Sequence, residues 1–179
     1  GFLSVLQGCR DVGVGHLVFA STSSAFGANG TLPYSVKQGV AHPLNVYSAT
    51  KIANEAMAHA YAYVFGLPCT GLRFFTVYGP WGRPDMALFK FPAAILKGEP
   101  IDVYGDGQME RDFTYIDDIV DGVIAALDSP VARDPAWNAV EPDPSTSGVA
   151  PWRILNLGAG RRERLQRYIE VLEDRLGRK

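Results

Sequence analysis

Three apolar runs, separated by helical patterns, constrain the fold of this chain more than any other feature. They are HLVFAS at residues 16–21, PCTGLRFFTVYG at 68–79 and WRILNLG at 152–158. Continuous apolar runs of this kind are typical of strands buried on both faces of a parallel sheet. Helices that alternate with such strands pack on the two faces of the sheet. The sequence therefore predicts an α/β fold with a parallel sheet.

Helices and connecting segments can be placed around these runs. Residues 46–65 are rich in Ala, Met, Glu and Lys, and a Gly and a Pro soon end the pattern. Further helices are expected at the start of the chain and at residues 84–99, 117–129 and 165–176. Residues 101–107 are expected to form a short strand and turn, and residues 111–116 an extended segment. Residues 128–152, rich in proline and without periodicity, are expected to form a long surface loop.

Composition and charge argue against several classes of function. The net charge of −2 and the dispersed Lys and Arg residues give no basis for nucleic-acid binding. No apolar run approaches the ~20 residues that span a bilayer, and no secretory signal is visible. We therefore expect no membrane association and a cytoplasmic location. Cys9 and Cys69 lack metal-ligand spacing and the three His residues are scattered, so we expect reduced thiols and no metal site.

The segment YSATK places a phenol and an ammonium group one helical turn apart. Tyr47 and Lys51 are four residues apart in an expected helix, so their side chains share one face. A nearby positive charge favours the phenolate, which turns a phenol with an ordinary pKa of about 10 into a usable base near neutral pH. A solvated Tyr and Lys on an amphipathic helix is the alternative, and the pair alone does not exclude it.

A hydroxyl-rich segment follows the first expected strand. Thr22, Ser23 and Ser24 come just after its carboxyl end, and ligands bind at that edge of open α/β sheets. If the helix that carries Tyr47 packs on the sheet, Thr22 and Tyr47 can meet there, and Lys51 completes the set. A base on a substrate alcohol, with a cofactor facing the carbon, is the arrangement that hydride transfer requires. A hydroxyl-rich turn without a ligand is the alternative.

Together these features resemble an extended short-chain dehydrogenase of the NAD-dependent epimerase/dehydratase branch. The hydroxyl loop, the Y-x-x-x-K segment and LRFFTVYGP fit the order of the family's Ser/Thr, Tyr and Lys residues. The resemblance implies that Thr22 is the catalytic hydroxyl and Tyr47 the base. It implies that Lys51 assists Tyr47 and that both contact the cofactor NAD, Lys51 at the nicotinamide ribose. The implied fold is a partial Rossmann-type parallel sheet with part of a smaller C-terminal substrate domain.

Two longer segments, residues 75–91 and 103–123, are similar specifically to UDP-glucuronate 4-epimerases. By this resemblance Thr76 and Arg83 face the carboxylate of a sugar. The guanidinium group of Arg suits that role because it can donate two parallel hydrogen bonds. A surface ion pair is the alternative for Arg83.

The resemblance also implies roles for three more residues at the substrate. An arginine at the position of Arg111 contacts the pyrophosphate of the nucleotide in the family. A buried ion pair with Asp112 or Asp117 is the alternative. Ser23 and Ser24 stand where dehydratases and decarboxylases of the family carry an acidic residue, so oxidation and reduction at one carbon without elimination is favoured.

The Gly-rich turn that binds the pyrophosphate of a dinucleotide is not visible in this sequence. In the family that unit would precede Gly1, so we interpret the chain as an internal fragment. Residues 1–79 are expected to form the C-terminal half of the NAD-binding domain with the catalytic residues. Residues 80–179 are expected to be mainly substrate-binding, with strands and helices that return to the Rossmann sheet. The resemblance implies a homodimer for the whole protein.

The expected function is therefore that of an NAD-dependent sugar-nucleotide 4-epimerase. The expected partner is a UDP-sugar, and the expected reaction interconverts UDP-glucuronate and UDP-galacturonate by transient oxidation at C4. Two alternatives remain open at this point. One is an epimerase of a neutral UDP-hexose, and the other is a non-catalytic α/β scaffold without the NAD fingerprint.

Overall fold

The computed structural model describes residues 1–178 and divides into two compact units. The first unit consists of residues 1–74 and 120–157, so a segment from the second half of the chain returns to it. The second unit consists of residues 75–119 and the segment that begins at Gly158.

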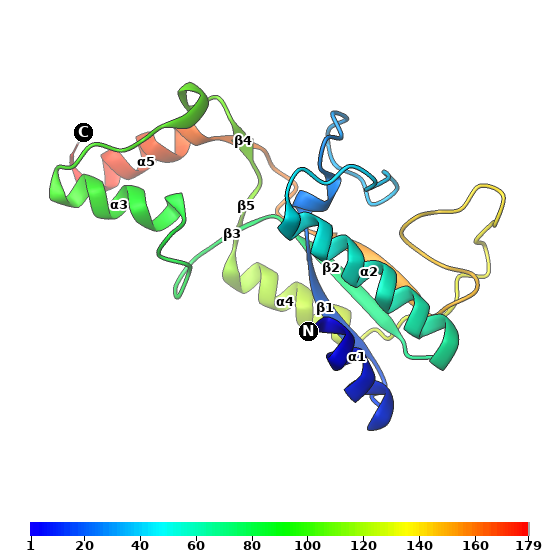
Figure 1. Ribbon diagram of the computed structural model, residues 1–179. Helices are drawn as coiled ribbons and strands as arrows, with labels where there is room; N and C mark the ends of the chain where they lie inside the picture. The colour runs from blue at the N-terminus through cyan, green and yellow to red at the C-terminus, as the bar shows by residue number, and fades with distance from the viewer. Residues whose placement is uncertain (179) are drawn as a thin grey trace. The chain divides into compact units, whose positions relative to one another are not determined.

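A three-stranded parallel sheet forms the centre of the first unit (Figure 1). The strands are β1 (Leu17–Thr22), β2 (Cys69–Phe74) and β6 (Trp152–Leu157), in the order β1-β2-β6. Both pairings, β1 with β2 and β2 with β6, are parallel and extend over six residues, so the carboxyl ends of the strands lie at one edge. The parallel sheet predicted from the apolar runs is confirmed.

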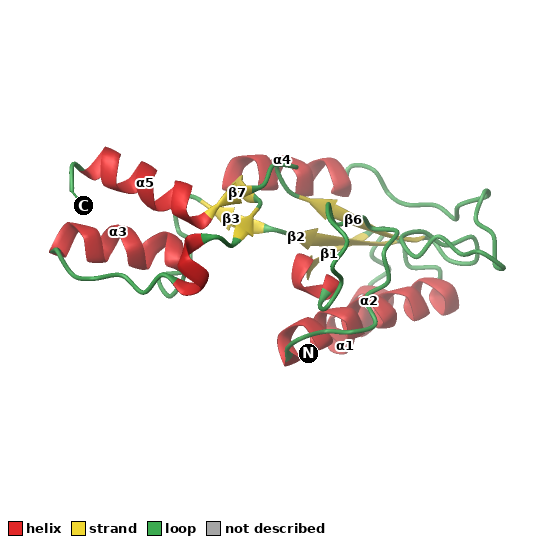
Figure 2. Ribbon diagram, turned by 90° about the horizontal axis from the view of Figure 1, so that it is seen from above, coloured by secondary structure: helices red, strands yellow, loops and turns green. Residues whose placement is uncertain are grey.

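Helices cover both faces of this sheet. Figure 2 shows α1 (Phe2–Asp11) and α2 (Val46–Phe65) on one face, and residues 120–127 of α4 (Ile116–Leu127) on the other. The core between the sheet and α1 and α2 is apolar. Its buried members are Leu6, Phe19, Ala58, Ala62, Leu67, Cys69, Ala150, Trp152 and Ile154. Burial of these side chains supplies the main driving force for docking the two helices.

Local signals in the sequence explain where α2 begins and ends. Asn45 is the N-cap, and its side-chain oxygen accepts a hydrogen bond from the backbone N–H of Ser48 at 2.8 Å. Gly66 ends the helix in the left-handed conformation, with φ 69°. Both residues fix the register of the helix, and so the positions of Tyr47 and Lys51 near its start.

Two short sheets belong to the second unit. β3 (Thr76–Tyr78) pairs in parallel with β5 (Phe113–Tyr115), and β4 (Glu110–Arg111) pairs antiparallel with β7 (Glu163–Arg164). The apolar run at 68–79, which predicts one continuous strand, is in fact broken after Phe74 into β2 and β3, which lie in different sheets.

Two helices complete the second unit and lie side by side in Figure 1. They are α3 (Ala87–Lys97) and α5 (Leu165–Leu176), and they pack through a small core of Phe91, Leu165 and Ile169. The strand predicted within residues 101–107 is wrong. Residues Tyr104–Gly107 form a short 3-10 turn, η2, in which Gly105 and Asp106 have φ values of 60° and 51°.

The segment before β6 is more ordered than a surface loop. Ser145 and Ser147 are buried, and Ser147 Oγ lies 3.0 Å from His59 Nε2 on α2. Asp134 accepts a hydrogen bond from Thr146 Oγ1 at 3.0 Å, and Arg153 donates to the carbonyl of Ser129. The segment is thus long and irregular, as predicted, but Ser147 attaches it to α2, and the other two hydrogen bonds hold its parts together.

No helix among residues 1–178 is long and apolar enough to cross a membrane. Both cysteines are free thiols, Cys69 buried and Cys9 half-buried. Burial, with a smaller contribution from Cys9, raises the pKa of the Cys69 thiol to about 12.

Candidate active site

The hydroxyl loop turns sharply at the carboxyl end of β1. Thr22 is the last residue of the strand and the N-cap of a 3-10 turn, η1 (Ser23–Phe26). Its buried Oγ1 accepts a hydrogen bond from the backbone N–H of Ser24 at 3.1 Å. Ser23 is half-buried and Ser24 is exposed. The hydroxyl-rich segment is therefore at the ligand-binding edge of the sheet, as the sequence predicts.

Gly27 ends this turn at a very close approach to another part of the loop. Its φ is 55°, and a Cβ at this position would lie 1.9 Å from the carbonyl oxygen of His42. The same carbonyl accepts a hydrogen bond from Ala28 N at 3.1 Å. Only glycine fits here, because any other residue would clash with the backbone. The contact holds the end of η1 against the segment that leads to Asn45 and α2.

Tyr47 and Lys51 lie near the start of α2, on one face, as their spacing predicts. Lys51 Nζ lies 5.7 Å from the centroid of the Tyr47 ring. Lys51 Nζ also donates a hydrogen bond to the carbonyl oxygen of Ala20 at 3.0 Å, two residues before Thr22. Tyr47 is 55% exposed, so a ligand can reach its ring. The structure thus brings Lys51 to the strand that ends in Thr22, with Tyr47 one turn earlier on the same helix.

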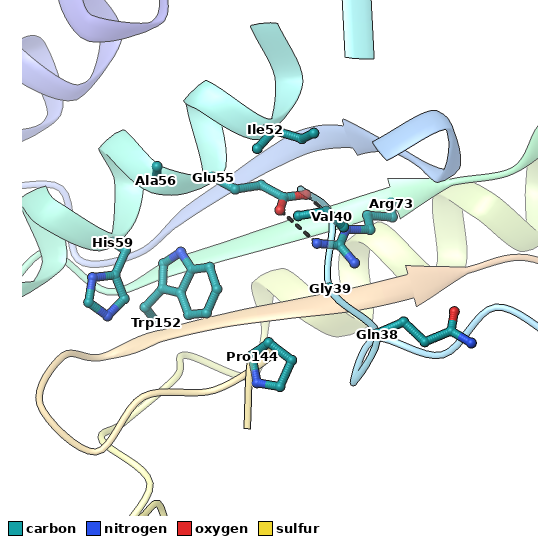
Figure 3. A pocket seen from close by; sticks show the side chains of 10 residues that line it. All are labelled: Gln38, Gly39, Val40, Ile52, Glu55, Ala56, His59, Arg73, Pro144 and Trp152. Atoms are coloured by element: carbon teal, nitrogen blue, oxygen red, sulfur yellow. Dashed lines mark hydrogen bonds and ion pairs between the residues drawn. The ribbon is translucent and has the colours of Figure 1, made fainter. Parts of the chain in front are cut away.

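Sequence reasoning missed Glu55, a third member of this helix face. Its carboxylate accepts a hydrogen bond from Ser21 Oγ at 2.5 Å and two from Arg73, from Nε at 2.9 Å and Nη2 at 2.8 Å. Figure 3 shows Glu55 on α2 facing Arg73 on the neighbouring strand. The spacing of Tyr47, Lys51 and Glu55, each four residues apart, is the sequence signal that could have found it.

Aromatic rings pack on the other side of Arg73. Its guanidinium lies 4.9 Å from the centroid of the buried Phe26 ring, and Phe26 stacks on Tyr34 with centroids 4.6 Å apart. The carbonyl of Tyr34 accepts a hydrogen bond from Asn156 Nδ2 at 2.9 Å. These contacts tie the hydroxyl loop to the ends of β2 and β6, and they stabilise the positive charge of Arg73.

Three predicted substrate residues belong to the second unit. Thr76 is half-buried at the start of β3, and its backbone N–H donates to the carbonyl of Asp112 at 3.0 Å. Arg83 is exposed and makes two hydrogen bonds to the carboxylate of Asp85, at 3.0 and 2.5 Å. That ion pair lowers the pKa of Asp85. The surface ion pair considered from the sequence is therefore present at Arg83.

Arg111 is exposed on β4. Its Nη1 donates to the carbonyl of Glu110 at 2.8 Å. The buried ion pair with Asp112 or Asp117, the alternative from the sequence, is wrong. The carboxylate of Asp112 instead accepts hydrogen bonds from the backbone N–H groups of Ala159 and Gly160, at 2.9 and 2.8 Å.

A pocket of about 360 Å³ lies in the first unit, beside the Glu55–Arg73 pair (Figure 3). Its lining residues are Gln38, Gly39, Val40, Ile52, Glu55, Ala56, His59, Arg73, Pro144 and Trp152. Burial lowers the pKa of His59, so its neutral form is favoured. Thr22, Tyr47 and Lys51, the residues predicted to be catalytic, are not among the lining residues, so this pocket is distinct from the predicted site.

The described part of the chain holds no group of three or more His, Cys, Asp or Glu side chains that could bind a metal ion. The groups predicted to act at the carboxyl edge of the first sheet are a phenol, an ammonium group and a hydroxyl, those of Tyr47, Lys51 and Thr22. Together these groups can exchange a proton with a substrate alcohol. The fold that carries these groups is an α/β fold with a parallel sheet, and its carboxyl edge is where ligands bind in open sheets of this class.

The chain belongs to the NAD dependent epimerase/dehydratase family, whose model matches residues 1–139. It is 52% identical over 177 residues to an uncharacterized 37.6 kDa protein in the cld 5' region of Escherichia coli O111:H-, a match that covers 99% of this chain and 53% of that protein. It is 44% identical over 181 residues to a probable UDP-glucuronate 4-epimerase of Rhizobium meliloti (strain 1021), covering 99% and 52%.

A solved structure shares the fold along nearly the whole chain. It is that of UDP-glucuronic acid 4-epimerase from Bacillus cereus in complex with UDP-glucuronic acid and NAD, with a TM-score of 0.81 and 30% identity. The match covers 99% of this chain and 51% of that one. The chain thus spans about half the length of the relatives that it matches.

Proposed function

We propose that the protein to which this chain belongs is an NAD-dependent sugar-nucleotide 4-epimerase that interconverts UDP-glucuronate and UDP-galacturonate. One observation carries the proposal: Lys51 joins the start of α2 to β1, so that Tyr47 and Thr22 belong to the same edge of the sheet. The family and the names of the relatives support the reaction class.

In the proposed reaction, Tyr47 acts as the base. Its phenolate takes the proton of the C4 hydroxyl while Thr22 Oγ donates a hydrogen bond to the same oxygen, and the C4–O bond becomes a carbonyl. The ammonium of Lys51 stabilises the phenolate because opposite charges favour the ionised form. In the reverse step Tyr47 returns the proton to the C4 oxygen, after the sugar has presented its other face.

The residues that are present fit one end of NAD. Lys51 uses one of its three N–H donors on Ala20, which leaves two for the hydroxyls of a ribose. Tyr47 is exposed enough to contact the same cofactor. When bound, NAD would accept the hydride from C4 and return it, so the sugar is oxidised and reduced in turn. Lys51 and Tyr47 would orient it.

We propose Thr76 and Arg83 as the contacts to the sugar carboxylate, Arg111 as the contact to the pyrophosphate, and Ser23 and Ser24 as further substrate contacts. A carboxylate matches a guanidinium with two parallel hydrogen bonds, which is the geometry that Arg83 now makes with Asp85. When the substrate binds, the sugar carboxylate would therefore replace the carboxylate of Asp85 as the partner of Arg83.

A neutral UDP-hexose is the second candidate substrate, and the Arg83–Asp85 pair favours it. An arginine that already has a carboxylate partner does not need one from the sugar. A neutral sugar would then bind without leaving a charge unmatched.

Product analysis of a full-length enzyme that contains this sequence tests the proposal. The enzyme is incubated separately with UDP-glucuronate and UDP-glucose, and the 4-epimers are separated by chromatography. We expect conversion of UDP-glucuronate to exceed that of UDP-glucose by about 10²-fold in kcat/KM, the scale set by one well-placed polar contact. Preference for UDP-glucose would favour the second candidate, and no conversion of either would favour a non-catalytic scaffold.

We also propose a homodimer for the whole protein. Apolar side chains on α1 and α2 are exposed, among them Leu3 and Val5 on α1 and Val64 on α2, which supports a protein contact on these helices. Light scattering coupled to size exclusion measures the mass directly, and a monomer at micromolar concentration would contradict the proposal. The cytoplasmic location stays a prediction.

A further inference from the structure

We infer that Glu55 is a positioning residue, which fixes helix α2 on the sheet through Ser21 and Arg73. The purpose of this contact is to keep Tyr47 and Lys51 at the carboxyl end of β1. Glu55 does not touch the reacting atoms in this account, and it acts through the residues that do. The inference rests on the proposed function, in which Tyr47 and Lys51 exchange a proton with the substrate.

Glu55, Ser21 and Arg73 form a buried, hydrogen-bonded clamp between α2 and the sheet. The side chains of Glu55 and Arg73 are 6% and 3% exposed, and Ser21 is 2% exposed. Ser21 and Arg73 are direct partners across β1 and β2, so one carboxylate spans both strands at the same register position. Its three hydrogen bonds, of 2.5 to 2.9 Å, have the short distances of charge-assisted bonds.

The clamp is adjacent to both parts of the proposed catalytic set. Ser21 directly precedes Thr22 in the strand. Glu55 lies one turn after Lys51, which donates to the carbonyl of Ala20. Helix α2 is therefore attached to the end of β1 at two successive turns. A rotation or shift of the helix would break both attachments together.

Stability alone does not explain why this contact is charged. Desolvation offsets most of the attraction in a buried ion pair, and apolar side chains of similar volume often stabilise a fold as well or better. The apolar core already holds α2 through Ala58 and Ala62. Hydrogen bonds depend on distance and angle, whereas apolar contacts are non-directional, so the hydrogen bonds of Glu55 can fix the position of α2 more closely. Position matters for the reaction because a displacement of about 1 Å can cost about 10²-fold in rate.

Two substitutions in a full-length enzyme that contains this sequence test the inference. Glu55→Gln keeps the size of the side chain but offers Arg73 one acceptor oxygen instead of two. Ser21→Ala removes only the hydrogen bond to β1 and is the milder change. For both we expect kcat with UDP-glucuronate to fall at least about 10-fold, with KM changed less than about threefold. We also expect the acid limb of the kcat–pH profile to move to higher pH, because Lys51 no longer assists Tyr47 as well.

Thr70→Val is the matched control. Thr70 is fully buried near the other end of β2, where its hydroxyl bonds to His16 Nε2 at 2.9 Å and Arg153 Nε at 3.1 Å. We expect this variant to have a lower melting temperature, with kcat and its pH profile unchanged within about twofold. If Ser21→Ala and Glu55→Gln behave in the same way, their role is structural only and the inference is overturned. If Glu55→Gln does not fold, Ser21→Ala decides.

The outcome can be separated from that of the proposed function. Tyr47→Phe tests the function directly, since it leaves the clamp intact. An inactive Tyr47→Phe enzyme combined with a fully active, unshifted Ser21→Ala enzyme would keep the proposed function and reject the clamp. A Tyr47→Phe enzyme with normal turnover would reject the proposed function itself.

Discussion

Replacement of Gly27 by alanine should disrupt the loop that connects the hydroxyl segment to α2. Gly27 has φ 55° and ψ −123°, a conformation that residues with a Cβ rarely adopt. The added Cβ would lie 1.9 Å from the carbonyl oxygen of His42 and 2.7 Å from its carbonyl carbon. Both are backbone atoms, so no side-chain rotation can relieve the clash. The segment around His42 and Pro43 must move.

Two contributions give the expected cost of Gly27→Ala. The unfavourable backbone conformation costs about 1–2 kcal/mol. Moving the His42 carbonyl breaks its 3.1 Å hydrogen bond from Ala28 N, which costs about 0.5–1.5 kcal/mol more. The free energy of unfolding should therefore fall by about 1.5–3.5 kcal/mol, a large share of the ~5–15 kcal/mol that stabilises a typical domain.

Urea unfolding followed by tryptophan fluorescence measures this change. Trp152 is buried in the first unit, whereas Trp81 is fully exposed and should report little. Gly30→Ala in the same loop is the matched control, since a Cβ there meets no heavy atom within 4 Å and its φ is not left-handed. The control should change stability by less than about 0.5 kcal/mol. Equal stabilities for the two variants would refute the reasoning.

Three further outcomes are expected. Arg83→Ala should lower kcat/KM for UDP-glucuronate by about 10²-fold and for UDP-glucose much less. If Arg83→Ala and Asp85→Ala lower kcat/KM equally, on both substrates, the role of Arg83 is only that of a structural ion pair. The Cys69 thiol, with its pKa raised to about 12, should resist alkylation at pH 8 until urea unfolds the protein, and mass spectrometry of labelled peptides checks this. Burial lowers the pKa of His59 below its ordinary 6.5 in the folded protein, so the unfolded state binds more protons at mildly acidic pH. The contribution of neutral His59 to the free energy of unfolding is therefore fully present above about pH 6.5. It is lost as the pH falls through the pKa of His59 in the folded protein. His59→Gln should accordingly weaken the drop in unfolding free energy between pH 7 and 5, and an unchanged drop would exclude His59 as its source.

The strands and the longest helix could be predicted because local signals decide them. Residues 17–22 and 152–157 are mainly apolar, and α2 has Asn45 at its start and Gly66 at its end. The break between β2 and β3 could not be predicted in this way. The sequence remains apolar through Phe74 and Phe75, and only pairing with β6 or with β5 separates the two strands.

The sequence predicts part of the candidate site. The spacing of Tyr47 and Lys51 predicts their common face, and the same rule extends to Glu55. Its partners Ser21 and Arg73 come from different strands, so they depend on the order and register of the sheet. Ser147 is likewise buried against a residue far away in the sequence, since its hydroxyl lies 3.0 Å from Nε2 of His59 on α2. No local pattern distinguishes these residues from surface polar residues.

The central claim is that Tyr47 is the base of the reaction. The most direct test is kcat of Tyr47→Phe with UDP-glucuronate, in a full-length enzyme that contains this sequence. Tyr63→Phe is the matched control, since Tyr63 is 60% exposed on the same helix. The account predicts that Tyr47→Phe lowers kcat by at least about 10²-fold, the usual scale for a lost acid–base group, and that Tyr63→Phe changes little. A Tyr47→Phe enzyme with turnover close to that of the unmodified enzyme would contradict it.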